Sequence, residues 1–227
     1  MAAAEILILS PHLDDGVLSL GAFIARASAS GTKVAVVTIF GGDPNSQAPA
    51  GRWDGRAGFE TAGAAARGRR EEDKAACELL GAECEWLPFF DNDYGAPPAE
   101  DLVWDQLERR AERAERVFVP GRPLIHQDHA WVSRLVSERA DPAKLVFYAE
   151  LPYDAWPEDK RGGQGAVAEL ARTRMWTTPR TGVRARLLKW RAAAAYSTQL
   201  PWLARPGYRT AVLKSRVGRE RLAWPTR

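Results

Sequence analysis

The sequence is poor in cysteine and histidine, and it has no apolar run long enough to cross a membrane. Its 227 residues include two cysteines, Cys77 and Cys84, and three histidines. Two cysteines at this spacing form neither a disulfide framework nor a CxxC site, so we expect a reducing, cytoplasmic environment. No apolar run approaches the roughly 20 residues that span a bilayer, and the first five residues lack the basic start of a signal peptide. We therefore expect no association with a membrane.

Positive charge is unevenly distributed along the chain. Residues 180–227 hold 12 Lys and Arg against one acid, Glu220, whereas residues 1–179 hold 20 basic and 28 acidic residues. A basic stretch can bind an anionic polymer, and a nucleic-acid binder is one reading of this segment. No nucleic-acid module signature accompanies the charge, so we favour a solvated face and expect no nucleic-acid partner.

The length and composition are those of an ordinary globular protein. Apolar residues make up 45% of the chain and charged residues 27%, which excludes disorder and coiled coil as the main state. We expect residues 1–227 to form one domain, with a core over about 1–150 and a C-terminal part, 151–227, that shapes the site.

Short apolar runs alternate with helical patterns along the first two thirds of the chain. The expected strands cover residues 5–10, 33–40, 84–87, 116–119 and 145–149. The expected helices cover residues 17–30, 69–80, 101–114, 130–139 and 184–197. Residues 41–68 read as a long loop, partly helical near 59–67. The alternation predicts an α/β fold with a doubly wound, mostly parallel, Rossmann-like sheet and a C-terminal extension. Ligands of such sheets bind outside the carboxyl ends of the strands.

All three histidines follow expected strands, and each lies near an aspartate. The residues concerned are His12, Asp14, Asp15, His126, Asp128 and His129. A lone histidine is usually structural, and one aspartate of the adjacent pair could simply cap a helix. Two adjacent carboxylates, however, repel each other unless a cation or donors offset their charge. The grouping at one edge of the sheet therefore favours a metal site.

The spacing suggests which side chains reach one ion. His12 and Asp15, with two residues between them in a turn, can do so together, and His129 from the distant loop would complete the set. Three protein ligands with one open position are typical of catalytic zinc. We expect one Zn²⁺ per chain, and other divalent ions would also suit these ligands.

Two motifs resemble those of the PIG-L/LmbE family of zinc-dependent N-deacetylases. Residues 12–15 (HLDD) resemble its PHPDD signature, with Leu13 in place of the usual proline, and residues 126–129 (HQDH) with Val132 resemble its HPDHxxV element. Weaker similarities are the RxxE element at residues 69–72 and the helix at 189–199. The resemblance extends from Ile6 to about Gln199. Gly16 and the insert at 43–68 depart from the usual pattern where substrate would lie.

This resemblance implies a role for each site residue. It assigns His12, Asp15 and His129 to zinc, and Asp14 to the general base. It makes His126 the partner of the developing oxyanion. Asp128 would then orient His126 or hold it protonated, or else support a histidine ligand.

The resemblance also implies an amino-sugar substrate, with loss of an acetyl group as the family norm. Arg69 and Asp91 match substrate-contacting positions of the family, although either could be an ordinary surface or turn residue. Trp53 and Tyr94 could stack on a sugar or pack their loops. Other tryptophans expected in loops, and so able to line a groove, are Trp131, Trp156 and Trp176.

Several alternatives stay open at this point. The chain could be an amidase acting on another small amide or a thiol conjugate. It could also be a catalytically silent metal-binding or sugar-binding module, although Asp14 argues against silence. A small-molecule substrate is the expected partner, and we leave self-association open.

Overall fold

A mixed β-sheet runs through the computed structural model, which describes residues 4–155, 171, 174–203 and 220–225. Its strands within the described residues are β1 (Ile6–Ser10), β2 (Val34–Thr38), β3 (Glu83–Trp86), β4 (Arg116–Arg122), β5 (Leu145–Ala149), β6 (Trp176–Thr177) and β7 (Leu222–Ala223). Their order in the sheet is β3-β2-β1-β4-β5-β7-β6. Strands β1 to β5 are parallel, and β7 pairs antiparallel with both β5 and β6. The predicted mostly parallel sheet is confirmed.

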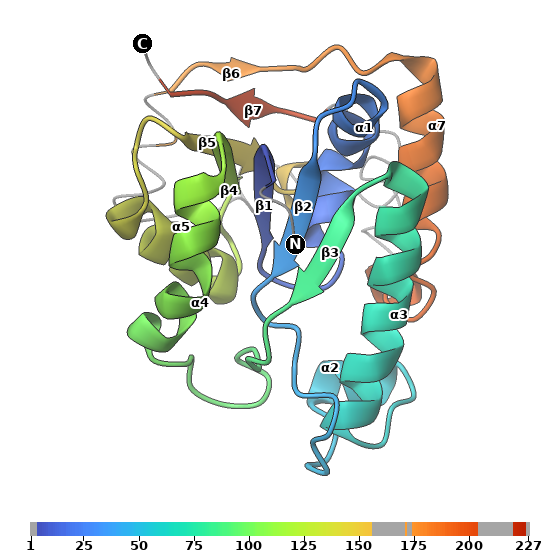
Figure 1. Ribbon diagram of the computed structural model, residues 1–227. Coiled ribbons are helices and arrows are strands. Elements are labelled where there is room, and N and C mark those ends of the chain that lie inside the picture. Colours follow the sequence, from blue (N-terminus) through green and yellow to red (C-terminus); the bar gives the residue numbers. More distant parts are fainter. Residues whose placement is uncertain (1–3, 156–170, 172–173, 204–219, 226–227) are drawn as a thin grey trace.

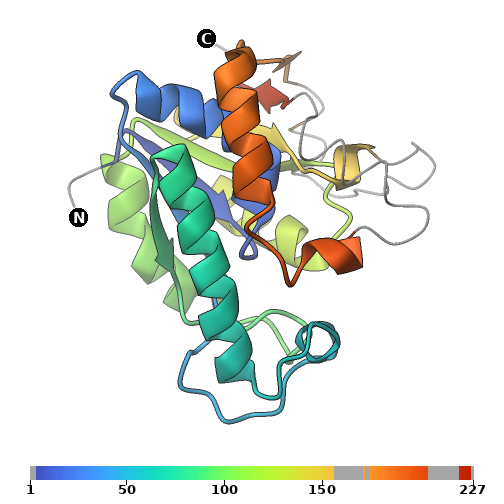
Figure 2. The same ribbon diagram turned by 90° about the vertical axis from the view of Figure 1, so that its right-hand side faces the viewer.

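Helices cover both faces of this sheet, as the alternating sequence pattern predicts. The helices whose bounds lie within the described residues are α1 (Asp15–Ala29), α2 (Arg52–Arg56), α3 (Ala62–Leu80), α4 (Glu100–Arg113), α5 (Gln127–Arg139), α7 (Gly182–Ala193) and α8 (Leu200–Leu203), with a 3₁₀ turn, η1, at Tyr153–Ala155. Helices α4 and α5 lie on one face, and α1, α3 and α7 on the other (Figure 1). Figure 2 shows α3 and α7 side by side. None of the described helices is both long enough and apolar enough to cross a membrane.

The central strands are buried on both faces, which explains their almost continuous apolar sequence. Leu7 and Leu9 of β1 pack in the core beneath α4 and α5, whereas Ile8 between them packs beneath α1 and α3. This period of two is what a strand imposes on its side chains. Parallel strands in turn bring the carboxyl ends of β1, β2, β4 and β5 to a single edge, which lies at the bottom of Figure 1.

All five predicted helices begin earlier than the sequence predicts, and the differences are largest for α3 and α5. Helix α3 starts at Ala62 rather than residue 69, because Thr61 caps it by accepting the Ala64 N–H at 3.1 Å and alanines favour the first turns. Helix α5 starts at Gln127 rather than residue 130, with His126 as its N-cap. His129 therefore lies in the first turn of a helix and not in a loop. Helix α7, in contrast, ends at Ala193, four residues before the predicted end.

The prediction of four loop tryptophans is wrong for three of them. Trp53 lies in α2, Trp131 in α5 and Trp176 in β6. Trp156 lies outside the described residues. The prediction of a loop over residues 41–68 missed α2. A helix this short leaves no clear pattern in a segment that is otherwise rich in Gly and Pro.

Candidate active site

The turn between β1 and α1 is shaped by side-chain bonds to its own backbone. The Ser10 hydroxyl donates to the His12 carbonyl at 2.6 Å and accepts the Gly16 N–H at 2.9 Å. The His12 N–H donates to Asp15 Oδ2 at 2.9 Å. These bonds fix the Asp15 carboxylate next to the His12 ring at the edge of the sheet.

Three potential ligand atoms form a small triangle at this edge. His12 Nδ1 lies 3.1 Å from His129 Nε2 and 3.2 Å from Asp15 Oδ2, and His129 Nε2 lies 3.1 Å from Asp15 Oδ2. Zinc bonds of about 2.0–2.2 Å in a tetrahedral site place ligand atoms roughly 3.3 Å apart. The His12–Asp15–His129 triangle therefore has the size and the donor types of a zinc site.

The outward nitrogen of each imidazole in the triangle contacts a carboxylate. His12 Nε2 lies 3.0 Å from Asp128 Oδ2, and His129 Nδ1 contacts Glu150 Oε1. The other oxygen of Glu150 accepts the Leu124 N–H at 2.7 Å, which fixes its orientation. When both rings are neutral and donate their N–H groups outward, each turns a lone pair towards the centre of the triangle. Metal-binding histidines are oriented by carboxylates in this way.

Electrostatics at the triangle favour a positive charge. Burial opposes the charged form of His12, but hydrogen bonds to Asp128 and Asp15 raise its pKa to about 9. Burial likewise opposes charge on His129, yet Asp15 and Glu150 raise its pKa well above the usual value. Although burial disfavours a charged Asp15, the two histidines hold its pKa well below the usual range. The surrounding acids thus supply the negative potential that a bound cation requires.

His126 offers a second way to complete a metal set. One ring nitrogen from each of His12, His126 and His129 lies within 4.8 Å of the others. This three-histidine set is looser than the triangle that includes Asp15. In addition, the Asp128 N–H donates to His126 Nδ1 at 3.4 Å, so this nitrogen already has a partner. The Asp15-containing triangle is therefore the better candidate for holding an ion.

The Asp14 carboxyl does not cap helix α1, although Asp14 stands at its N-terminus. Asp14 precedes α1, but its side chain accepts no N–H from the first turn. It is 9% exposed and lines the cavity described below. Burial, and then the neighbouring Asp15 carboxylate, raise its pKa to about 7. Asp14 is thus a carboxyl group beside the triangle and outside it.

His126 is half-buried beside the same centre. Burial, and then His12 and His129, lower its pKa to about 4, so the ring is neutral at neutral pH. Because Nδ1 accepts an N–H, the ring proton belongs on Nε2, where it can be donated. Asp128 Oδ2 lies 3.6 Å from His126 Nδ1 but 3.0 Å from His12 Nε2. Of the roles expected for Asp128, these distances favour support of His12 over protonation of His126.

A cavity of about 320 Å³ opens at this edge of the sheet. Its lining includes three of the predicted substrate-binding residues, Trp53, Arg69 and Asp91, together with Asp14 and His126. Asp128 and His129 lie beneath its surface, at 3% and 0% exposure. The structure thus brings nine of the ten predicted site residues to one cavity or directly behind it.

The remaining predicted residue, Tyr94, lies outside the lining of this cavity. Its hydroxyl donates to Asp54 Oδ2 at 2.6 Å, and its ring packs against Phe90 at 4.9 Å between centroids. Asp54 Oδ1 also accepts from Arg69 Nη1 at 3.2 Å. Tyr94 and Asp54 therefore support Arg69 and α2 from behind.

The far wall of the cavity comes from the C-terminal part of the chain. Gln199 Oε1 accepts from Trp53 Nε1 at 2.6 Å, and so joins this part to α2. Glu72 of α3 holds the preceding residues, because its carboxylate accepts from the Ser197 hydroxyl and from both the N–H and hydroxyl of Thr198 at 2.8 Å.

Sequence reasoning missed Glu150, Asp54 and Gln199. Glu150 carried a usable signal, since it directly follows a buried strand at the edge where the histidines gather. Gln199 ends the segment 189–199 that resembles a helix of the family, which was its only signal, because its partner Trp53 lies 146 positions away along the chain. Asp54 gave no signal, since its partner Arg69 lies 15 positions away.

Comparisons with known structures agree with this fold. The A40926 pseudoaglycone deacetylase is 29% identical, with a TM-score of 0.75 over 98% of this chain and 96% of that one. A zinc-inhibited form of a teicoplanin deacetylase is 20% identical, with a TM-score of 0.71 over 97% of each chain. The N,N′-diacetylchitobiose deacetylase of Pyrococcus horikoshii is 19% identical, with a TM-score of 0.56 over 92% of this chain and 76% of that one. At these identities, the latter two show a shared fold alone.

A family comparison covers the residues of the triangle. The sequence model described as GlcNAc-PI de-N-acetylase, that of the PIG-L family, matches residues 7–140. This range contains His12, Asp14, Asp15, His126 and His129, and more than half of the chain. The chain therefore belongs to the PIG-L family.

Proposed function

We propose that this chain is a metal-dependent hydrolase that removes an acetyl group from an N-acetylated amino sugar in a sugar conjugate. The observation that carries the proposal is the His12–Asp15–His129 triangle with the free Asp14 carboxyl beside it in one cavity. The description of the family, GlcNAc-PI de-N-acetylase, and the similarity to the A40926 pseudoaglycone deacetylase support this reaction class.

The triangle would hold one Zn²⁺ through His12 Nδ1, Asp15 Oδ2 and His129 Nε2. When bound, zinc lowers the pKa of water and polarises a carbonyl oxygen. Asp128 and Glu150 keep the two imidazoles in the tautomer that presents the inward nitrogen. Asp15 supplies one negative charge to the ion, which leaves Asp14 for another role.

Two side chains outside the triangle, Asp14 and His126, would carry out the proton transfers. Asp14 would take the proton of the attacking water and return it to the leaving amine, as a general base and then a general acid. His126 would donate its Nε2 proton to the oxyanion that develops on the acyl carbonyl. A module that merely bound a metal or a sugar would need neither group.

The cavity suits a small sugar ligand. Its volume of about 320 Å³ lies near the lower end of the roughly 300–1,000 Å³ that is typical of small-molecule sites. We assign Arg69 and Asp91 to contacts with sugar hydroxyls, and the Trp53 ring to one face of the sugar.

The proposal is tested by release of free amine from a panel of N-acetyl amino sugars and their conjugates, with thiol-conjugate amides included. We expect turnover of N-acetyl sugars by protein loaded with Zn²⁺, its loss in the presence of a chelator, and its return on addition of a divalent ion. Full activity of a metal-free preparation would contradict the mechanism. Turnover of the thiol conjugates alone would reassign the substrate.

Glu150→Gln is expected to weaken zinc binding about 10–100-fold, the usual cost of losing such a supporting carboxylate. Glutamine has nearly the same shape, but it does not carry the negative charge that orients and polarises His129. Competition with a chromogenic chelator measures the affinity. Glu138→Gln, which alters an exposed acid on α5, is the matched control. Equal zinc affinity of the two variants would remove Glu150 from the site.

A further inference from the structure

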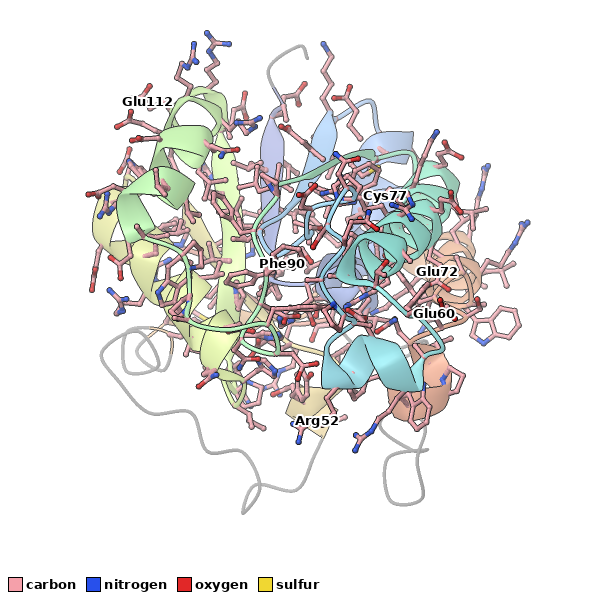
Figure 3. The ribbon with its side chains drawn as sticks, turned by 90° about the horizontal axis from the view of Figure 1, so that it is seen from below. Arg52, Glu60, Glu72, Cys77, Phe90 and Glu112 are labelled. Atoms are coloured by element: carbon pink, nitrogen blue, oxygen red, sulfur yellow. The ribbon has the colours of Figure 1, made fainter. Side chains whose placement is uncertain are left out.

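Helix α2 brings two arginines to the cavity that contains the triangle. Arg52 and Arg56 are four residues apart, which places their side chains on the same side of this single turn. Both are exposed, and both line the cavity. Figure 3, which looks onto the carboxyl edge of the sheet from below, shows Arg52 at the end of α2. Neither arginine has a role in the hydrolysis proposed above.

These two guanidinium groups have no acidic partner within the described part of the chain. No ion pair or side-chain hydrogen bond of either is found there, whereas Arg69, the third arginine of the cavity, is bound to Asp54 at 3.2 Å. The nearby acids have other partners, since Asp93 Oδ2 accepts the Trp53 N–H at 2.8 Å and Asp91 Oδ1 accepts the Asp93 N–H at 2.9 Å. Like charges at this spacing on one helical turn repel each other, and a bound anion would reverse that cost.

The helix that carries them is held from three directions. Trp53 Nε1 donates to Gln199, the Trp53 N–H donates to Asp93, and Asp54 accepts from both Arg69 and Tyr94. The backbone beneath the two arginines is therefore positioned before any ligand arrives. A ligand that binds them therefore loses less conformational entropy in ordering the site. Guanidinium groups bind carboxylate and phosphate oxygens with two parallel hydrogen bonds.

We propose that Arg52 and Arg56 form a subsite for an anionic group, a carboxylate or a phosphate, on the substrate. This inference rests on the proposed deacetylase function. An acetyl group carries no charge, so the anion belongs to the amino-sugar part that keeps the nitrogen. The preferred substrates are therefore acidic N-acetyl amino sugars or their conjugates.

Three compounds with the same acetamide test the subsite: N-acetylglucosamine, its 6-phosphate, and the corresponding uronic acid. We expect kcat/KM of the wild-type protein to be about 10–100-fold higher for at least one anionic compound than for the neutral one. This is the size of effect that hydrogen bonds between the guanidinium groups and an anion can produce. In the Arg52→Ala/Arg56→Ala double variant, this ratio falls to near one. Arg109→Ala, which alters an exposed arginine on α4 outside the cavity, keeps the wild-type ratio.

The outcomes separate this inference from the proposed function. Turnover of the neutral sugar without any preference for an anion would overturn the subsite and leave the hydrolase intact. An equal loss on all three compounds in the double variant would also overturn it, because α2 would then act only as a structural wall. If none is turned over, calorimetric binding of the same compounds to the wild-type protein decides, since equal affinities for the neutral and anionic sugars contradict the subsite.

Discussion

Replacement of Asp14 by asparagine is expected to lower kcat about 10²–10⁴-fold, the range that general acid–base catalysis contributes. The asparagine amide keeps the size of the carboxyl group but cannot take a proton from water at neutral pH. Asp14 is outside the triangle, so the zinc content of the variant is expected to equal that of the wild-type protein. Amine release and elemental analysis of the same preparation measure the two quantities.

Asp101→Asn is the control for this experiment, because Asp101 is an exposed acid on α4 and is not among the residues that line the cavity. Its kcat is expected to match the wild type. An Asp14→Asn protein that retains most of its kcat would show that another group moves the proton. Loss of zinc together with activity would instead place Asp14 among the ligands.

His129→Ala is expected to abolish both zinc binding and measurable turnover. His129 is fully buried, and it provides one corner of the triangle while its other nitrogen contacts Glu150. Without its imidazole, only His12 and Asp15 remain, and two ligands hold a catalytic zinc poorly. Zinc content after dialysis and amine release by the same sample are the measurements, and circular dichroism checks the fold.

Two further variants decide between the triangle and the three-histidine set. If the triangle binds the ion, Asp15→Asn loses zinc, whereas His126→Ala keeps zinc and turns over slowly for want of an oxyanion donor. The three-histidine set gives the opposite pattern of zinc content. An unchanged zinc content in His129→Ala itself would contradict both arrangements.

The sheet and the chemistry-bearing edge could be predicted from the sequence because they depend on local patterns. The sequence predicts strand β5 at its observed bounds, since this strand is a continuous apolar run between polar segments. It also predicts the turn at His12, Asp14 and Asp15 at the carboxyl edge, because this turn directly follows such a run. Histidine and aspartate that directly follow parallel strands indicate a binding or catalytic site, because the carboxyl ends of such strands lie at one edge of the sheet.

The walls of the cavity could not be predicted in the same way. Helix α2 has five residues and flanking glycines, so no periodic pattern marks it. The packing of Trp53 against Gln199, and the pairing of Arg69 with Asp54, depend on tertiary contacts between separate segments. Tyr94 is an error of the opposite kind. It is predicted to contact the sugar, but its hydroxyl donates to Asp54 behind the cavity wall.

The bond between Trp53 and Gln199 has a consequence for how this protein could change its substrate over evolution. It joins two stretches of sequence that are 146 positions apart, one in the insert after β2 and one beyond the segment that matches the family. A mutation that reshapes one stretch displaces its partner in the other. Adaptation to a new sugar would therefore need paired substitutions, whereas the reacting groups on the strand ends could stay as they are.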